Sequence, residues 1–180
     1  MQLLYLLLLL CLASIDAHAE DNIWLLIDTK KLMVEVKQGS KTIETYNNIA
    51  IGRNGSAHKS QRGDDITPLG TYKISWVNED SDYYRFYGFD YPSKEDAQRA
   101  LSNQTINQQT YKSIIQAHQQ NQPPPQNTPL GGQIGIHGLG EGDIKIHQTV
   151  NWTHGCIALT NQQLDKLSQW LKEGTRVEVQ

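Results

Sequence analysis

One cysteine near the C-terminus, Cys156, is close in sequence to two histidines, and this combination can support nucleophilic chemistry. A thiol becomes an effective nucleophile when a base removes its proton and a third group orients that base. His137 lies 19 positions before Cys156, and His154 lies two positions before it. Between them, Gly155 has no Cβ, so a substrate carbonyl could approach backbone N–H groups that would form an oxyanion hole.

The chain contains two cysteines, and its first residues suggest that only one of them is kept. Residues 1–12 are almost wholly apolar and lead into Ala17-His18-Ala19, the small-x-small pattern of a signal-peptidase site. We therefore predict a signal peptide at residues 1–19, which removes Cys11. Cys156 is then an unpaired thiol in an exported protein, and such a thiol is buried and inert, bridged between molecules, or reactive.

Length and charge limit the classes of protein to consider. Removal of 19 of the 180 residues leaves 161, a size typical of a single domain, which we place at residues 20–180. The 16 basic residues nearly balance the acidic ones, so no field would attract nucleic acid. A membrane span needs about 20 apolar residues, and no second apolar run of that length follows, so we expect no stable membrane insertion.

Short strands dominate the secondary structure that we expect. Apolar or alternating segments bounded by Gly, Asp, Lys and Ser are typical of strands. The predicted strands cover residues 23–28, 32–36, 42–46, 71–77, 83–91, 133–137, 143–148 and 175–179. The polar, glycine-containing segment 52–65 between them is a predicted loop.

Two stretches favour helix instead. Residues 94–120 are rich in Ala, Gln, Lys and Glu without Gly or Pro, and we predict two helical pieces broken near Ser102-Asn103. They form an insertion at about 94–127, either a lid or, as we prefer, a buttress. Thr160 and Gln163 make a capping box before a stripe of leucines. The fold class is therefore mainly β, with a helical insertion and a C-terminal helix plus strand.

The residues around the thiol resemble a known family. Ile136-His137-Gly138, followed by Thr153-His154-Gly155-Cys156-Ile157-Ala158-Leu159, is similar to the signature of the L,D-transpeptidase catalytic domain, or YkuD-type, family. That signature is a His-Gly pair followed by [Ser/Thr]-His-Gly-Cys. Thr67-Pro68-Leu69-Gly70-Thr71-Tyr72 also resembles the Thr-Pro-x-Gly-x-Tyr segment of this family. The resemblance spans roughly residues 23–179 and implies a β-sandwich or β-barrel-like domain.

This resemblance implies cysteine-dependent acyl transfer on peptidoglycan stem peptides containing meso-diaminopimelate, through a thioester acyl-enzyme, in the periplasm or cell envelope. Cys156 would be the nucleophile and His137 the general base, oriented by the carbonyl of Gly138. The supporting residues would be His154, Gly155 in the oxyanion hole, and Thr153 with a hydrogen bond within the loop. No cofactor is implied. We also expect the imidazole to hold Cys156 partly as thiolate below the usual pKa of about 8.5.

One departure from the family pattern concerns the acceptor. Most members carry Arg two residues after the cysteine, whereas this chain has Ala158. It resembles a branch that includes enzymes that hydrolyse peptidoglycan amide bonds and detach a bound lipoprotein. An amine acceptor gives transpeptidation and water gives hydrolysis, as in an L,D-carboxypeptidase, and we expect hydrolysis to be more favoured here. A wall-linked lipoprotein is a candidate partner. The competing classes are a non-catalytic peptidoglycan-binding module and a Cys-His peptidase of another fold.

A zinc site is the metal alternative, because imidazole and thiolate are good zinc ligands. Its ligands would be His137, His147, His154 and Cys156. Their spacing matches no known zinc pattern, so we expect no bound metal. For His147, at the end of the predicted strand 143–148, packing is the expected role.

Other polar and aromatic residues favour ordinary structural roles. We expect His58 and His118 to be solvated, and Arg53 and Lys59 to be exposed charges of the glycine-containing loop. The aromatic run at 83–91 is typical of a strand packed on one face. The alternative is that its aromatic residues wall a substrate groove, with Tyr84 or Tyr87 at the site; the run comprises Tyr83, Tyr84, Phe86, Tyr87, Phe89 and Tyr91.

Overall fold

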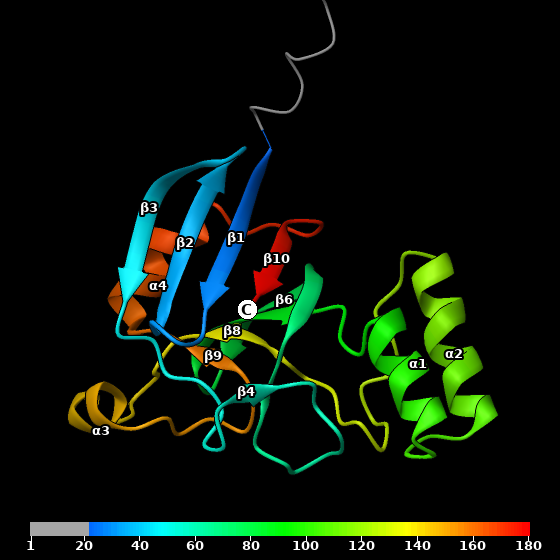
Figure 1. Ribbon diagram of the computed structural model, residues 1–180. Coiled ribbons are helices and arrows are strands. Elements are labelled where there is room, and N and C mark those ends of the chain that lie inside the picture. The colour runs from blue at the N-terminus through cyan, green and yellow to red at the C-terminus, as the bar shows by residue number, and fades with distance from the viewer. Residues whose placement is uncertain (1–21) are drawn as a thin grey trace, which may run out of the picture.

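The computed structural model describes residues 22–180, so the predicted signal peptide at 1–19 lies outside the described residues (Figure 1). Of the described residues, 22% are helical and 35% lie in strands, which confirms the prediction of a mainly β domain. The strands are β1 Ile23–Asp28, β2 Met33–Gln38, β3 Lys41–Asn47, β4 Ser56–Ala57, β5 Thr67–Pro68, β6 Gly70–Ser81, β7 Tyr84–Phe89, β8 Gly135–His137, β9 Ile157–Ala158 and β10 Arg176–Val179.

Eight of these strands form one mixed sheet in the order β3-β2-β1-β10-β6-β7-β8-β9. The long strand β6 joins its two halves, because its first residues pair with β10 and its later residues pair with β7. Register shifts along the β6–β7 pair mark bulges, which bend a strand and increase its twist. The strands β4 and β5 form a separate parallel pair.

The two edges of the sheet approach each other. Just after β3, Ala50 bridges to Ala158 in β9, and Gly52 bridges to Thr153. The amide of Ala158 donates to the Ala50 carbonyl at 2.8 Å, and the amide of Ala50 donates back to the Ala158 carbonyl at 2.9 Å. The sheet is therefore nearly closed, in agreement with the predicted barrel-like domain.

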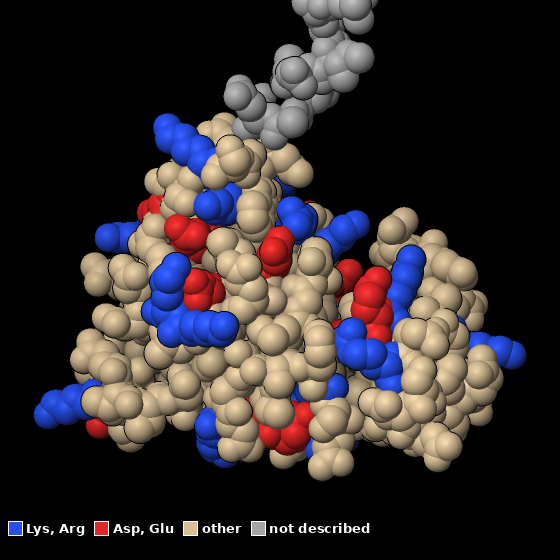
Figure 2. Space-filling view, in the orientation of Figure 1, with Lys and Arg blue, Asp and Glu red and all other residues tan. Residues whose placement is uncertain are grey.

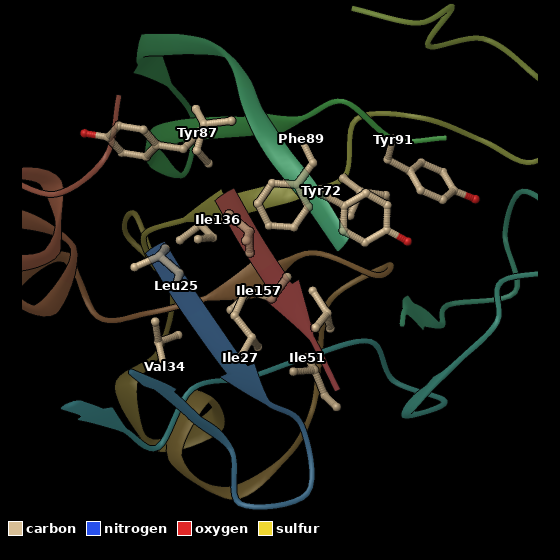
Figure 3. Close-up of a cluster of buried hydrophobic side chains, with 14 of the residues drawn as sticks. Leu25, Ile27, Val34, Ile51, Tyr72, Tyr87, Phe89, Tyr91, Ile136 and Ile157 are labelled. Carbon is tan, nitrogen blue, oxygen red and sulfur yellow. The ribbon is translucent and has the colours of Figure 1, made fainter. Parts of the chain in front are cut away.

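A hydrophobic core fills the inside of this curved sheet (Figure 3). Alternating residues of β1 and β2 point inward, since Leu25, Ile27 and Val34 have no solvent-exposed surface. The rings of Tyr72 and Phe89 stack with centroids 5.6 Å apart. Burying each such side chain contributes about 1.5–3 kcal/mol, so the core fixes which face of every strand points outward.

The predicted helical insertion is present as two helices, α1 Lys94–Ser102 and α2 Gln108–Gln119, which lie together at one side of the sheet (Figure 1). The break between them falls where it was predicted. Asp96 is buried in α1, where it completes a capping box with Ser93 and accepts a hydrogen bond from the Tyr72 hydroxyl at 3.2 Å. Ala97 and Ile114 of the two helices also join the core, so the insertion is tied to the domain and packs as a buttress.

The predicted strand at 143–148 is wrong, because this segment forms the helix α3, Ile144–Thr149. Asp143 caps it by accepting a hydrogen bond from the Lys145 amide at 2.7 Å. The alternation of Ile144 and Ile146 with polar residues suggested a strand, but both isoleucines are exposed, by 42% and 52%. A short apolar alternation cannot by itself distinguish a strand from a helical turn.

The C-terminal helix α4, Asn161–Ser168, begins at the predicted capping box of Thr160 and Gln163 and is followed by β10. Leu164 and Leu167 point from α4 into the core. Among residues 22–180, no helix is long and apolar enough to cross a membrane. Figure 2 shows acidic and basic side chains interspersed on one face, in keeping with the nearly balanced charge of the chain.

Candidate active site

The two central residues of the candidate site lie on neighbouring strands. β8 pairs in parallel with β9, so that His137 stands opposite Ala158 and Ile136 stands opposite Ile157. Side chains two residues apart along a strand point to the same face, so Cys156 lies diagonally to His137 on one face. Ile136 and Ile157 point to the other face, into the core, where both are fully buried. The alternation of the two strands thus places Cys156 and His137 on the same face, one diagonal step apart in the β8–β9 register.

His137 is a buried, neutral imidazole. Only 4% of its surface is exposed, and its Nδ1 lies 2.7 Å from the carbonyl oxygen of Gly138. A carbonyl can only accept, so Nδ1 carries the proton and Nε2 is the basic nitrogen. Burial lowers the pKa of His137 to about 4, while the Gly138 carbonyl opposes this shift and the nearby His147 adds slightly to it.

Three aromatic side chains surround the His137 ring: Tyr83 and Phe86 belong to the aromatic run considered for a substrate groove, and Trp152 was not considered for the site. Tyr83 is closest, with ring centroids 4.8 Å apart, and Trp152 meets the ring edge-on at 5.7 Å. Phe86 faces His137 across the β7–β8 pair at 6.4 Å. The sequence had suggested Tyr84 and Tyr87 as groove residues. Tyr87 is instead buried, as the alternation of the strand predicts for one face.

The loop before the nucleophile is held by its own threonine. The Thr153 hydroxyl donates to the Cys156 carbonyl at 2.7 Å and accepts from the Gly155 amide at 3.1 Å. The backbone of Thr153 is also tied to the segment after β3, because its amide donates to the Ile51 carbonyl at 3.1 Å. The Gly155 amide is thus occupied within the loop, which leaves the Cys156 amide as the better placed oxyanion donor.

His154 and Gly155, which follow Thr153, contact the segment that precedes β5. His154 is largely exposed, and its Nδ1 lies 2.7 Å from Oδ1 of Asp65. This contact, and more weakly Arg53, lower the pKa of Asp65. Gly155 has φ +128°, and an added Cβ would lie 2.6 Å from the Ile66 carbonyl oxygen. Only glycine fits both this backbone conformation and this close approach.

The Cys156 thiol is protonated in this environment. It donates to the Gln133 carbonyl at 3.2 Å, and burial raises its pKa to about 11. The Gly135 amide and the charge of Lys59 oppose the shift. This environment argues against the expected standing thiolate, because burial disfavours the charged form of both partners.

Lys59 departs from the prediction of an exposed loop charge. It is buried, and its ammonium pairs with Asp64, whose carboxylate also accepts from the amides of Ser60, Gln61 and Ile66. Burial opposes ionisation of Asp64, but these contacts hold its pKa below the usual value. The pair organises the polar loop against which Gly155 packs. A lysine within a polar, glycine-containing loop gives no periodic signal of burial, so its burial could not be predicted from the sequence.

A pocket of about 420 Å³ opens beside the aromatic residues that contact His137. Its lining combines apolar, aromatic and charged side chains, namely Arg53, Asp82, Tyr83, Leu139, Glu141, Gly142, Asp143, Ile146 and Trp152. The side chain of Arg53 is half exposed, as predicted for a loop charge. Tyr83 and Trp152 line this pocket and also contact the His137 ring, so they link the pocket to the surroundings of the base.

The other histidines take different positions. His58 is exposed, as predicted. His118 is not solvated as predicted, because α2 packs its ring onto the Pro92 carbonyl at 2.8 Å. His147 is buried on α3. Among residues 22–180, no group of three or more His, Cys, Asp or Glu side chains is arranged to hold a metal ion, so the four residues of the zinc alternative do not form one ligand set.

The fold and site together define a barrel-like β domain with a Cys-His pair on two adjacent strands. The sequence model of the YkuD family, the L,D-transpeptidase catalytic domain, matches residues 22–179. Because the match covers nearly the whole chain, the protein belongs to the L,D-transpeptidase catalytic domain family. This confirms the resemblance drawn from the residues around His137 and Cys156.

Solved structures share the fold. Pgp2 from Campylobacter jejuni, a helical cell shape determining protein, is 20% identical with a TM-score of 0.58, over 90% of this chain and 51% of that one. Bd1075 from Bdellovibrio bacteriovorus is 16% identical with a TM-score of 0.56, over 92% and 50%. The L,D-transpeptidase from Xylanimonas cellulosilytica is 13% identical with a TM-score of 0.50, over 91% and 62%. The chain thus spans about half the length of the first two. No curated protein sequence matches it significantly.

Proposed function

We propose that this protein is an exported acyltransferase that acts on peptidoglycan stem peptides, with Cys156 as nucleophile and His137 as general base. Membership of the L,D-transpeptidase catalytic domain family supports the substrate class. The observation that carries the assignment is the pairing of β8 with β9. It places the thiol and a neutral imidazole on one face, with the Gly138 carbonyl fixing Nε2 as the basic nitrogen.

The chemistry begins from a neutral pair, because burial raises the pKa of Cys156 to about 11 and lowers that of His137 to about 4. Proton transfer therefore accompanies attack. The thiol leaves the Gln133 carbonyl, its proton passes to Nε2 of His137, and sulfur bonds to the substrate carbonyl carbon. The Cys156 amide would stabilise the oxyanion. The imidazolium then protonates the leaving amine as the C–N bond breaks, which leaves a thioester.

Release of the acyl group repeats these transfers in reverse. An acceptor, either water or an amine, attacks the thioester carbonyl while His137 removes its proton. The C–S bond breaks, and the departing thiolate of Cys156 takes the proton back from the His137 imidazolium. Which acceptor reacts depends on how well each is oriented near the thioester.

We propose water as the main acceptor, so that the reaction is hydrolysis. Most relatives are expected to carry arginine at the position of Ala158, so this chain has no guanidinium there as a bidentate partner for an acceptor carboxylate. Ala158 is fully buried between Ala50 and His137, and the segment after β3 packs directly against it. Ala158→Arg alone would displace that segment and so cannot restore such a partner without repacking. A wall-linked lipoprotein remains a candidate substrate under this proposal.

The test is incubation with defined stem peptides, with and without an added amine, followed by mass spectrometry. We expect a covalent adduct at Cys156 and shortened free stems, and neither product from Cys156→Ala as the matched control. Cross-linked products that dominate at physiological amine concentrations would make the protein a transpeptidase. Turnover by Cys156→Ala would overturn the nucleophile assignment. Binding of stem peptides without any adduct would instead identify a peptidoglycan-binding module.

A further inference from the structure

His147 is a buried titratable side chain that the proposed chemistry does not use. It lies in the last turn of α3 with 3% of its surface exposed. Its Nε2 has no hydrogen-bond partner among residues 22–180, and the Asn48 carbonyl favours the protonated ring without forming a regular hydrogen bond. A buried imidazole with an incompletely satisfied nitrogen costs stability, so a compensating contact is to be expected.

That contact is with Trp152. The indole Nε1 donates to Nδ1 of His147 at 3.3 Å, and the two rings meet edge-on with centroids 6.4 Å apart. An indole can only donate, so Nδ1 of His147 must accept and the ring must be neutral. Burial lowers the pKa of His147, which keeps the ring in this accepting form at neutral pH.

Trp152 in turn contacts the base and the pocket. Its ring packs edge-on against His137 at 5.7 Å and lies 6.0 Å from Tyr83. It is also part of the lining of the 420 Å³ pocket. The backbone on either side of Trp152 is anchored to Ile51, through the Thr153 amide and the Asn151 side chain. For the indole itself, the hydrogen bond that the described residues provide is the one to His147.

We propose that His147 is a positioning residue, which holds the Trp152 indole as the shared wall of the pocket and of the His137 site. This inference rests on the proposed function for its effect on turnover. The contact between His147 and Trp152 is independent of that function and can be measured separately.

Two replacements of His147 separate a positioning role from simple packing. In His147→Asn, the amide oxygen can take the place of Nδ1 as acceptor, whereas His147→Leu fills the space without any acceptor. We expect His147→Leu to lower kcat/KM for a stem peptide at least tenfold, and His147→Asn to remain within threefold of wild type. Trp152→Phe should match His147→Leu. The double variant should be no worse than either single one, because residues that act through one contact are not additive.

A readout without substrate keeps this inference separate from the proposed function. The near-ultraviolet circular dichroism of Trp152 is obtained as the difference between wild type and Trp152→Phe. This difference signal should be lost in His147→Leu and retained in His147→Asn. His118→Leu, which removes another partly buried histidine from the insertion, is the matched control and should leave the signal and turnover unchanged.

Equal behaviour of the Asn and Leu variants in the dichroism signal would overturn the proposal, as would multiplied losses in the double variant. If wild type shows no turnover on stem peptides while the dichroism follows the expected pattern, the proposed function fails and the positioning contact stands. All measurements are made below the melting temperature of every variant.

Discussion

Replacing Gly155 by alanine tests how closely the nucleophile loop packs on the neighbouring loop. An added Cβ would lie 2.6 Å from the Ile66 carbonyl oxygen and 3.1 Å from Cδ1 of Ile134, at a φ of +128°. Gly63 offers a matched control within the polar loop. It also has a positive φ, +78°, but nothing lies within 4 Å of an added Cβ.

Gly155→Ala and Gly63→Ala both place alanine at a positive φ, but only Gly155→Ala also brings a Cβ into overlap with a neighbouring atom. A non-glycine residue in a sparsely populated backbone region costs about 1–3 kcal/mol, which applies to both positions. Relief of the overlap with the Ile66 carbonyl adds about 1–3 kcal/mol at Gly155 alone, as in other overpacked sites. We therefore expect Gly155→Ala to lose roughly 2–6 kcal/mol of unfolding free energy, compared with roughly 1–3 kcal/mol for Gly63→Ala.

The overlap also has a functional consequence, because Cys156 follows Gly155 directly. A displacement of about 1 Å in a reacting group can cost about a hundredfold in rate. We expect at least a tenfold loss of stem-peptide turnover in Gly155→Ala and less than a twofold change in Gly63→Ala. Urea unfolding and the mass-spectrometric assay provide the two measurements. Equal destabilisation of both variants, or wild-type turnover in Gly155→Ala, would refute the packing argument.

Three further predictions follow from the charged and titratable groups. Alkylation of Cys156 in the folded protein should have a midpoint above pH 10, and at pH 8 should be about a hundredfold slower than in the urea-unfolded chain with its pKa of about 8.5; a folded midpoint below 8.5 would contradict the protonated thiol. The unfolded chain takes up the His137 proton near pH 6.5 and the folded protein only near pH 4, so stability should fall as pH drops through this window, by up to about 1.4 kcal/mol per pH unit for this group. Urea unfolding of His137→Phe should show a shallower slope there, and an unchanged slope would rule this origin out. Lys59→Met should cost up to about 3 kcal/mol of unfolding free energy, because it removes the cation beside the partly buried carboxylate of Asp64. The double variant with Asp64→Asn should recover part of that loss; no recovery would speak against the ion pair.

The sequence predicted helices and strands best where a periodic pattern of apolar residues ended at a recognisable turn or cap. The capping box at Thr160 and Gln163 marked the start of α4, and the gap after Ser102 separated α1 from α2. Prediction failed at 143–148, where a short alternation resembled a strand. The capping bond of Asp143 and the burial of His147 on α3 outweigh a pattern only six residues long.

Around the proposed catalytic pair, the sequence identified residues in the loop motif, but it offered Tyr83 only as one of several aromatic candidates and gave no indication of Asp65. Thr153 and Gly155 act locally, through bonds and close contacts of the loop itself. Tyr83 reaches His137 from the turn before β7, and Asp65 reaches His154 from the loop before β5. Such contacts depend on which distant segments meet, and a single sequence carries no local signal for them.

The sequence by itself determined the chemistry available to this protein, because side-chain type and spacing specify a thiol, an imidazole and a glycine on the segments that carry them. Only the tertiary structure decided how these groups are placed and which protonation states are favoured. Pairing of β8 with β9 brings Cys156 and His137 to one face, where His137 is buried and Cys156 is partly exposed. Burial withdraws water from both groups and so favours their neutral forms, a property of the assembled site that depends on atoms far away in the chain.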